Sequence, residues 1–220
     1  MILKTKLFGH VYEFKSIREV MAKANEEKSG DKLAGIAAET AEERVAAKVV
    51  LSNLTLNDLR NCPAVPYEED EVTRIIQDSV NETIFNEYKN MTVAEFREWL
   101  LDTQTTPDMI RRASRGLTSE IVAGVCKLMS NLDLIYAAKK MRVTAHCNTT
   151  IGLPGTFSSR LQPNHTTDDP NGIIASVMEG LSLGCGDAVI GLNPVDDSVE
   201  SVARILKMFD EFKRKWEVPT

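Results

Sequence analysis

The sequence predicts an α/β protein in which an N-terminal β-hairpin and a helical region precede two strand–helix units. Three observations predict this class. Apolar and polar residues alternate over residues 1–14, apolar residues recur at helical spacing up to about residue 130, and the order after residue 140 is strand, long loop, helix, strand, short loop, helix. The last order implies parallel strands covered by helices. We therefore expect a hairpin and helical domain over 1–130 and a second domain over 131–220.

The helices of the first domain are marked at their starts. Three segments carry a hydroxyl residue followed three positions later by glutamate: Ser16 with Glu19, Thr40 with Glu43, and Thr92 with Glu95. This is the capping-box pattern, in which the two side chains satisfy free backbone amides at a helix N-terminus. Thr106 followed by Pro107 marks another start.

The apolar spacing within these segments predicts core positions rather than chemistry. The predicted stripes are Val72, Ile75, Ile76, Val80 and Ile84; Val93, Phe96, Trp99 and Leu100; and Ile121, Val122, Val125 and Leu128. A further helix with a basic C-terminus is predicted over 132–140. We interpret every stripe as a buried helix face.

The second domain shows a different pattern. The stretch "RVTAHC" (142–147) suits a short buried strand, and "DAVIGL" (187–192) suits a second. Residues 149–172 between them read as one long polar loop, much longer than the about 4–6 residues of an ordinary connection. Helices are predicted from Asp169 to the glycine at 184 and again from residue 197.

Polar side chains of two loops are expected at one edge of the predicted sheet, because both loops leave the carboxyl ends of parallel strands. Parallel α/β folds bind their ligands at this edge. The polar side chains are Thr149, Thr150, Arg160 and Gln162 from the long loop and Asn193 from the short one. Arginine is a permanent cation with several donors, suited to a carboxylate, a phosphate or a developing oxyanion. The amides of Gln162 and Asn193 donate and accept, which suits an alcohol or an amine. An ion pair with Asp168 or Asp169 is the alternative role for Arg160.

Composition and motifs argue against several classes of function. The net charge of −6 argues against nucleic acid or an anionic membrane as a partner. No apolar run reaches the ~20 residues of a membrane span, and no secretory signal is expected. The four cysteines lack metal-site spacing, and the acidic residues near 168 and 196 fit helix starts. We therefore predict no metal site and free, buried thiols.

Longer motifs resemble a known family. They are "KTKLFGHVYEF", "RVAAKVVLS", "VTRIIQDSVNET", "RGLTSE", "TIGLPGTFSSRLQPN" and "GDAVIGLNPV", and they are spread over the whole chain. In these motifs the sequence resembles the N-terminal half of the large (heavy) subunit of ethanolamine ammonia-lyase. The resemblance implies a (β/α)8 TIM-type barrel, of which this chain holds the preceding N-terminal region and the first two βα units.

The same resemblance implies an adenosylcobalamin-dependent enzyme that converts ethanolamine to acetaldehyde and ammonia by a radical mechanism. It implies that Arg160, Gln162 and Asn193 contact substrate, that Arg160 is also catalytic, and that Pro194 lines the cofactor side. It further implies a small (light) subunit and other copies of the large subunit as partners. The expected location is the cytoplasm, within a bacterial microcompartment.

Two alternatives stay open. Two strands cannot close an eight-stranded barrel, and the acidic residues with which the family holds its substrate are expected beyond Thr220. The chain is therefore expected to be inactive alone, and a non-catalytic helical assembly module is one alternative. A cofactor-free barrel lyase or aldolase is the other, although the sequence lacks a strand-end lysine suited to a Schiff base.

Overall fold

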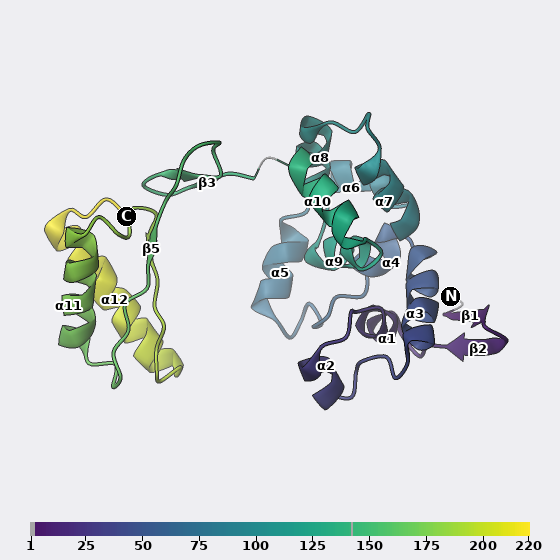
Figure 1. Ribbon diagram of the computed structural model, residues 1–220, viewed down its shortest axis with the longest axis horizontal. Coiled ribbons are helices and arrows are strands. Elements are labelled where there is room, and N and C mark those ends of the chain that lie inside the picture. The colour runs from purple at the N-terminus through teal and green to yellow at the C-terminus, as the bar shows by residue number, and fades with distance from the viewer. Residues whose placement is uncertain (1–2, 142) are drawn as a thin grey trace. The chain divides into compact units, whose positions relative to one another are not determined.

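The computed structural model describes residues 3–141 and 143–220. Met1, Ile2 and Arg142 lie outside the described residues, and with them the start of the predicted hairpin and of the strand predicted at 142–147. The chain divides into two compact units, Met1–Arg142 and Val143–Thr220, which we call the N-terminal and C-terminal units (Figure 1). The sequence analysis placed its division after residue 130 instead.

The N-terminal unit begins with the predicted hairpin. Strands β1 (Lys4–Leu7) and β2 (His10–Glu13) pair antiparallel, with Leu7 opposite His10. The two turn residues, Phe8 and Gly9, have φ angles of 53° and 82°. A type I′ turn requires positive φ at both central positions, and glycine adopts such angles without a steric cost.

Short helices make up most of the rest of this unit (Figure 1). In chain order they are α1 (Ile17–Lys23), α2 (Ser29–Leu33), α3 (Ala41–Ser52), α4 (Leu56–Arg60), α5 (Glu71–Asp78), α6 (Glu82–Tyr88), α7 (Val93–Leu101), α8 (Pro107–Ser114), α9 (Ser119–Lys127) and α10 (Asn131–Lys140). The helix predicted over 132–140 is α10, and it packs against α7.

The predicted helix starts are confirmed, but only one of the three expected capping boxes closes completely. Glu95 N donates to Thr92 Oγ1 at 3.1 Å, and Thr92 N donates back to Glu95 Oε2 at 2.7 Å. The Ser16 and Thr40 hydroxyls also cap their helices, but the glutamates three positions later accept from the amide one residue before the cap. Complete boxes that the sequence analysis missed begin α4 and α10, where aspartate stands in the place of glutamate.

The core of the N-terminal unit draws on the hairpin and on most of the helices. Its fully buried side chains include Val20, Leu51, Leu59, Val93 and Ile121. The predicted stripe at 93–100 supplies three of its four residues to this core. The stripe predicted over 72–84 is wrong as a single buried face, because the chain breaks between α5 and α6 and cannot keep one helical phase. Its first positions, Val72 and Ile75, are each 61% exposed.

The first strand predicted for the C-terminal unit is wrong in its partner and in its burial. Within 142–147 the described strand is β3 (Ala145–His146), whose two residues are exposed. It pairs antiparallel with β4 (Thr150–Ile151), which lies in the predicted loop. The chain reverses at once after His146, so the partner is the next segment along the chain rather than a distant parallel strand.

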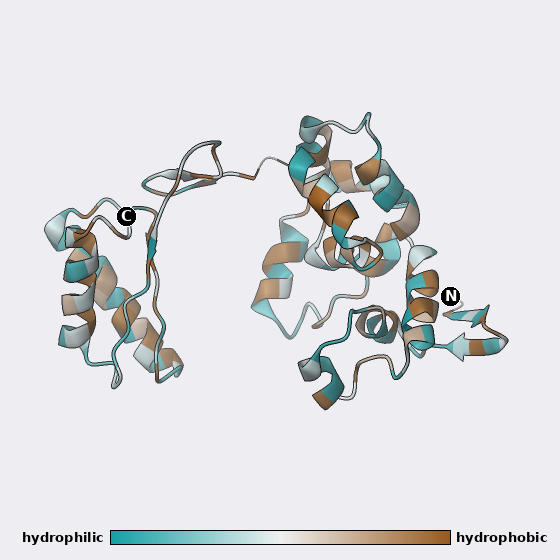
Figure 2. Ribbon diagram, in the orientation of Figure 1, coloured by the Kyte–Doolittle hydropathy of each residue, from teal (hydrophilic) through white to brown (hydrophobic). Residues whose placement is uncertain are grey.

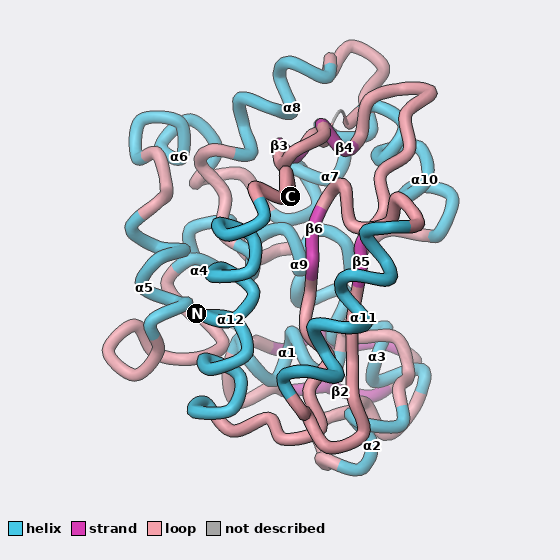
Figure 3. The backbone as a smooth tube through the Cα atoms, turned by 90° about the vertical axis from the view of Figure 1, so that its left-hand side faces the viewer, coloured by secondary structure: helices cyan, strands magenta, loops and turns pink. Residues whose placement is uncertain are grey.

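The parallel strand pair that the sequence predicts exists, but its first strand lies elsewhere. Strand β5 (Arg160–Leu161) pairs in parallel with β6 (Val189–Ile190), and each is followed by a helix, α11 (Pro170–Ser182) and α12 (Val199–Trp216). Figures 1 and 3 place both helices on the same side of the strands. The α/β class is therefore confirmed, with β5 replacing the strand expected at 142–147.

A small core lies between these helices and the strand pair. Ile173 and Val177 of α11 and Ile205 and Phe209 of α12 are buried, and the two strands contribute Leu161 and Ile190. Hydrophobic and hydrophilic residues alternate in patches along α12, as expected for a helix with one buried side (Figure 2). The helices cover only the face of the strand pair to which Leu161 and Ile190 contribute.

Candidate functional site

Arg160 lies on the side of the strand pair that faces away from the helices. The parallel register sets Arg160 opposite Val189 and Leu161 opposite Ile190. Leu161 and Ile190 pack against the helices, and successive side chains of a strand point to opposite faces. Arg160 and Val189 are accordingly exposed. Adjacent residues of β5 thus divide between the core and the open face.

The guanidinium of Arg160 lies across β6 at Gly191. A Cβ atom placed on Gly191 would lie 2.6 Å from Nη2 and 2.8 Å from Nε of Arg160. Such distances are below van der Waals contact, so the missing side chain at Gly191 is what makes room for the guanidinium. Among the described residues Arg160 forms no ion pair within 4.0 Å, so the alternative of a salt bridge with Asp168 or Asp169 is not realised.

The other predicted polar residues lie at the carboxyl ends of these two strands. Gln162 directly follows β5 and is exposed. Gly191 N donates to Leu161 O at 2.8 Å, which extends the pairing beyond the end of β6. Asn193, exposed, and Pro194, half-buried, follow after Leu192. The structure therefore brings Arg160, Gln162 and the Asn193–Pro194 pair to the same end of the strand pair.

Thr149 and Thr150 do not join this group. Thr149 Oγ1 lies 2.7 Å from Ser158 Oγ, just before β5 begins, and Thr150 Oγ1 lies 3.0 Å from His146 Nδ1 within the β3–β4 hairpin. The sequence analysis expected them beside Arg160 because it treated the strand at 142–147 as the parallel one. Because β5 is that strand, the two threonines precede it in the chain and do not lie at its carboxyl end.

Asp168 joins the loop after β5 to the loop after β6. Its carboxylate accepts from Val195 N at 2.9 and 3.0 Å and from Asp196 N at 2.7 Å, and the residue is only 4% exposed. The hydrogen bonds from Asp196 and Val195 hold the pKa of the Asp168 carboxyl below its usual value, against the effect of burial. The sequence analysis explained Asp168 as a helix-start residue. In the structure Asp169 has that role, because it caps α11 by accepting from Gly172 N at 2.8 Å.

A second carboxylate fixes the opposite end of the strand pair. Asp187, just before β6, accepts from Ser159 N at 2.7 Å, and Gly186 N donates to Ser159 Oγ at 2.9 Å. The hydrogen bonds from the Ser159 hydroxyl and amide lower the pKa of the Asp187 carboxyl. Each end of the strand pair thus has its own aspartate. Asp187 accepts from the residue before β5, and Asp168 accepts from the loop after β6.

Histidine and cysteine do not contribute to the strand-end group. His165 Nδ1 lies 3.1 Å from Thr167 Oγ1 and 3.3 Å from Thr167 N, so it organises its own turn. Cys62, Cys126, Cys147 and Cys185 are free, as predicted, but all four are exposed rather than buried. Within residues 3–141 and 143–220 no group of three or more acidic, histidine or cysteine side chains could hold a metal ion. No helix in this part of the chain has the length and apolar character needed to cross a bilayer.

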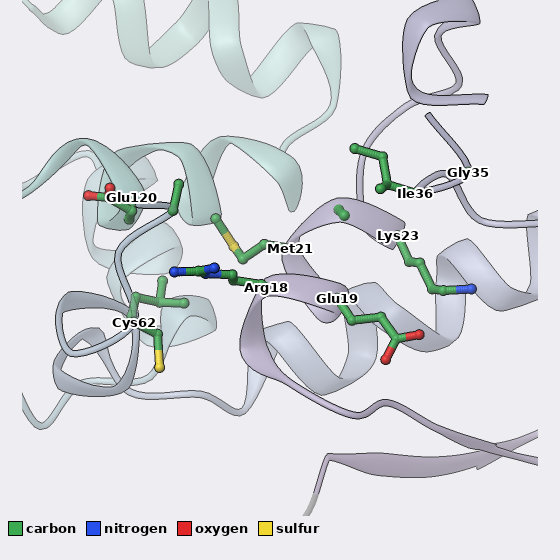
Figure 4. A pocket seen from close by; sticks show the side chains of 11 residues that line it. Arg18, Glu19, Met21, Lys23, Gly35, Ile36, Cys62 and Glu120 are labelled. Carbon is green, nitrogen blue, oxygen red and sulfur yellow. The ribbon is translucent and has the colours of Figure 1, made fainter. Parts of the chain in front are cut away.

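Two cavities of the N-terminal unit have no part in this group. One, of about 410 Å³, is lined by residues of α1 and the segments around Gly35 and Cys62, and Arg18 reaches across it to donate to Pro63 O at 3.2 Å (Figure 4). The other, of about 530 Å³, is an apolar groove lined mainly by α7, α8, α9 and α10. Neither cavity gathers the converging donors and acceptors that the end of the β5–β6 pair presents.

Known proteins are similar to this chain over almost its whole length. The model of the ethanolamine ammonia lyase large subunit family matches residues 12–220. Over 220 residues the chain is 57% identical to the ethanolamine ammonia-lyase large subunit of Escherichia coli and to that of Salmonella typhimurium. The chain belongs to this family. Each alignment covers 100% of this chain and 49% of the relative, so the chain spans about half the length of these ethanolamine ammonia-lyase large subunits.

Proposed function

We propose that this chain supplies part of the substrate- and cofactor-binding face of an adenosylcobalamin-dependent ethanolamine ammonia-lyase, within a large subunit of the length of its relatives. The observation that carries the proposal is the placement of Arg160, Gln162 and Asn193 at one end of a parallel strand pair. That end is where parallel α/β folds bind ligands. The strand pair would form the first two strands of a (β/α)8 barrel.

The three side chains suit a small amino alcohol. The guanidinium of Arg160 would hold the substrate hydroxyl and stabilise negative charge that develops on its oxygen. The amides of Gln162 and Asn193 would orient the hydroxyl and amino groups, since each amide both donates and accepts. Fixing the substrate in this way lowers the entropic cost of reaching the reactive geometry.

The segment after β6 fits one side of a large cofactor. Pro194 is half-buried and Val195 is 67% exposed, so an apolar surface directly follows the polar Asn193. Such a surface suits the edge of the adenosylcobalamin macrocycle, and Pro194 is the residue we assign to it. When bound, the cofactor supplies the radical that removes a hydrogen atom from the substrate. This chain would contribute position and exclusion of water.

We infer that the chain alone is inactive, since it spans 49% of the relatives and contains only the β5 and β6 part of the proposed barrel. The proposed partners are the small subunit and other copies of the large subunit. The apolar groove lined by α7 to α10 in the N-terminal unit supports a role in subunit assembly. Under the alternative of a helical assembly module, assembly would be the sole function of the chain. A cytoplasmic location within a microcompartment is proposed from family membership alone.

The decisive test removes the guanidinium from a polypeptide of the relatives' length that contains this chain. Arg160→Ala should lower ethanolamine turnover by roughly 10²–10³, as expected for the loss of one donor to a developing oxyanion. Turnover would be measured with adenosylcobalamin and the small subunit present. Arg214→Ala is the matched control, because Arg214 is exposed on α12 and its one ion pair among the described residues is with Asp210, four residues earlier. Equal turnover in the two variants would refute the assignment of Arg160.

Omission of the cofactor separates the two enzymatic interpretations. The proposed enzyme should convert no ethanolamine without adenosylcobalamin, whereas a cofactor-free lyase would keep its rate. Absence of turnover under both conditions, in the full-length protein with its small subunit, would leave the helical assembly module as the better interpretation.

A further inference from the structure

We propose that Asp168 is a positioning residue that sets the loop of Asn193 and Pro194 against the end of β5, an inference that rests on the proposed function. The hydrogen bonds that the Asp168 carboxylate accepts across the loops do not come from Asn193 or Pro194. The carboxylate binds the two residues that directly follow them, Val195 and Asp196. The side chains assigned to substrate and cofactor are therefore held from one side by β6 and from the other by Asp168.

The geometry is that of a built contact rather than of a surface aspartate. The residue is 4% exposed, and both carboxylate oxygens accept from backbone amides. Its φ angle is +50°, a conformation that non-glycine residues adopt rarely and that aspartate and asparagine tolerate best. A buried carboxylate in an unusual backbone conformation persists only where its surroundings fix it. The β6–α12 loop supplies those surroundings.

Arg204 of α12 and, to a smaller extent, His165 three residues earlier also lower the pKa of Asp168, by less than the loop amides do. Neither forms an ion pair with it within 4.0 Å among the described residues. The carboxylate is therefore stabilised mainly by the loop amides, so the loop amides are what its removal would release.

The consequence for catalysis is geometric. The loop after β6 is short and exposed, with Asn193 and Val195 both open to solvent. Without the Asp168 bonds, the contacts that remain to this loop among the described residues are those of Leu192 with the small core and of the Asp196 carboxylate with Ser198. A displacement of about 1 Å at a positioning contact can cost up to roughly 10²-fold in rate. Arg160, which lies in β5, and Gln162, which directly follows it, would keep their places, so the loss would affect the contacts made by Asn193 and Pro194.

Two substitutions at Asp168 distinguish a positioning role from a merely structural one. Asp168→Gly accepts the positive φ but removes both oxygens, whereas Asp168→Asn keeps the backbone preference and one acceptor. Asp169→Ala is the matched control, because Asp169 is the next residue along the chain and its carboxylate caps α11 through Gly172 N rather than binding the β6 loop. All three would be made in the full-length subunit with its small subunit and cofactor.

Two readouts are required, one of which does not depend on activity. Hydrogen exchange at the Val195 and Asp196 amides should become about tenfold faster or more in Asp168→Gly and increase less in Asp168→Asn. The KM for ethanolamine should rise about 10- to 100-fold in Asp168→Gly, with partial recovery in Asp168→Asn. Asp169→Ala should lower thermal stability while it leaves both the loop exchange and the KM unchanged.

Each alternative outcome has a definite meaning. Unchanged exchange at Val195 and Asp196 in Asp168→Gly would overturn the inference whatever the activity. Faster exchange with the KM of the parent would show that Asp168 fixes the loop without positioning substrate, and would also overturn it. If the parent protein itself failed to turn over ethanolamine, the proposed function would fall and the exchange data would still report on the loop contact.

Discussion

The N-terminal unit buries its apolar residues among many helices, whereas the C-terminal unit buries them on only one side of a strand pair. In the first, the hairpin and all the helices from α1 to α10 except α2 and α5 share one core. In the second, four residues of α11 and α12 form the buried centre, and the strands contribute from one face. The face left open is the one that carries Arg160. The unit with the smaller core is thus the unit with the candidate site.

This difference shows how a site and a core compete for the same strands. A strand residue that contacts ligand cannot also pack against a helix, because the alternation of side chains gives it to the other face. In the C-terminal unit Arg160 of β5 and Val189 of β6 therefore stay exposed, and only their neighbours Leu161 and Ile190 pack against the core. In the N-terminal unit the core lies among helices and the hairpin, and its apolar groove lined by α7 to α10 presents few polar groups.

Truncation of one core residue in each unit should have the largest effect on stability. Leu59→Ala in α4 and Ile205→Ala in α12 each remove a buried branched side chain, at a cost of ~2–5 kcal/mol. The chain has two tryptophans, Trp99 in α7 and Trp216 at the end of α12, so each unit has its own fluorescent probe. Urea titrations of Trp99→Phe and Trp216→Phe backgrounds would follow the units separately.

The comparison predicts selective losses. Ile205→Ala should abolish the transition seen by Trp216 and leave that of Trp99 in place, while Leu59→Ala should do the reverse. Val199→Ala is the control in α12, since Val199 is 87% exposed. Equal shifts at both probes from either substitution would show that the two units unfold together, and the comparison would fail.

Gly191→Ala should have an intermediate effect, on activity rather than on stability. The added methyl would occupy the place of the Arg160 guanidinium, which is the flexible end of a side chain and can move away. We expect kcat/KM for ethanolamine to fall about tenfold, equivalent to ~1.4 kcal/mol, with an unchanged Trp216 transition. Gly30→Ala, whose new Cβ would meet no atom within 4 Å, is the control. A rate equal to that of the parent would mean that the guanidinium does not need its place over β6.

Acid should have the smallest and most local effect, at the start of α10. Hydrogen bonds from the Ser130 amide, and then from Arg97 and the Ser130 hydroxyl, lower the pKa of Asp133 from its usual 3.8 to about 2. A carboxyl with a lowered folded-state pKa stabilises the fold above its unfolded pKa, and this contribution disappears as the pH falls through the folded value. We expect the α10 start to loosen between about pH 4 and pH 2.

Carboxyl titration by NMR would measure that pKa directly, with amide shifts of α10 as the structural readout. Asp133→Asn should remove the pH dependence of α10 in this window while the rest of the N-terminal unit titrates as before. An Asp133 midpoint near its usual value would contradict the role of the capping contacts.

Local sequence patterns predicted the helices better than they predicted the strands. Helix starts are encoded within four residues, so Ser16, Thr40, Thr92 and Thr106 could each be identified without tertiary information. Strand β5 has only Arg160 and Leu161, which is too short for an alternation to be recognised. Its existence depends on β6, which is distant in the sequence. The segment "RVTAHC" has a strand-like pattern, but its described strand, Ala145–His146, pairs with the nearby Thr150–Ile151.

The members of the candidate site were proposed from the sequence, whereas the contacts that hold them in place were not. Arg160, Gln162 and Asn193 were proposed from their place near predicted strand ends and from the resemblance, although the strand that pairs with β6 was predicted at 142–147 and is β5 instead. Asp168 was not found, because a carboxylate before a helix has an ordinary explanation as part of the helix start. Only the structure shows that its neighbour takes that role and that Asp168 reaches the other loop.

The opposite orientations of Arg160 and Leu161 have a consequence for how the proposed substrate site can change. Selection on substrate preference would act at positions 160, 162 and 193, while selection on folding would act at 161, 190 and the helices behind them. Neighbouring codons are thus under separate constraints. A library randomised at the three polar positions should retain a high proportion of folded members, which makes this strand end a practical starting point for directed evolution toward other amino alcohols.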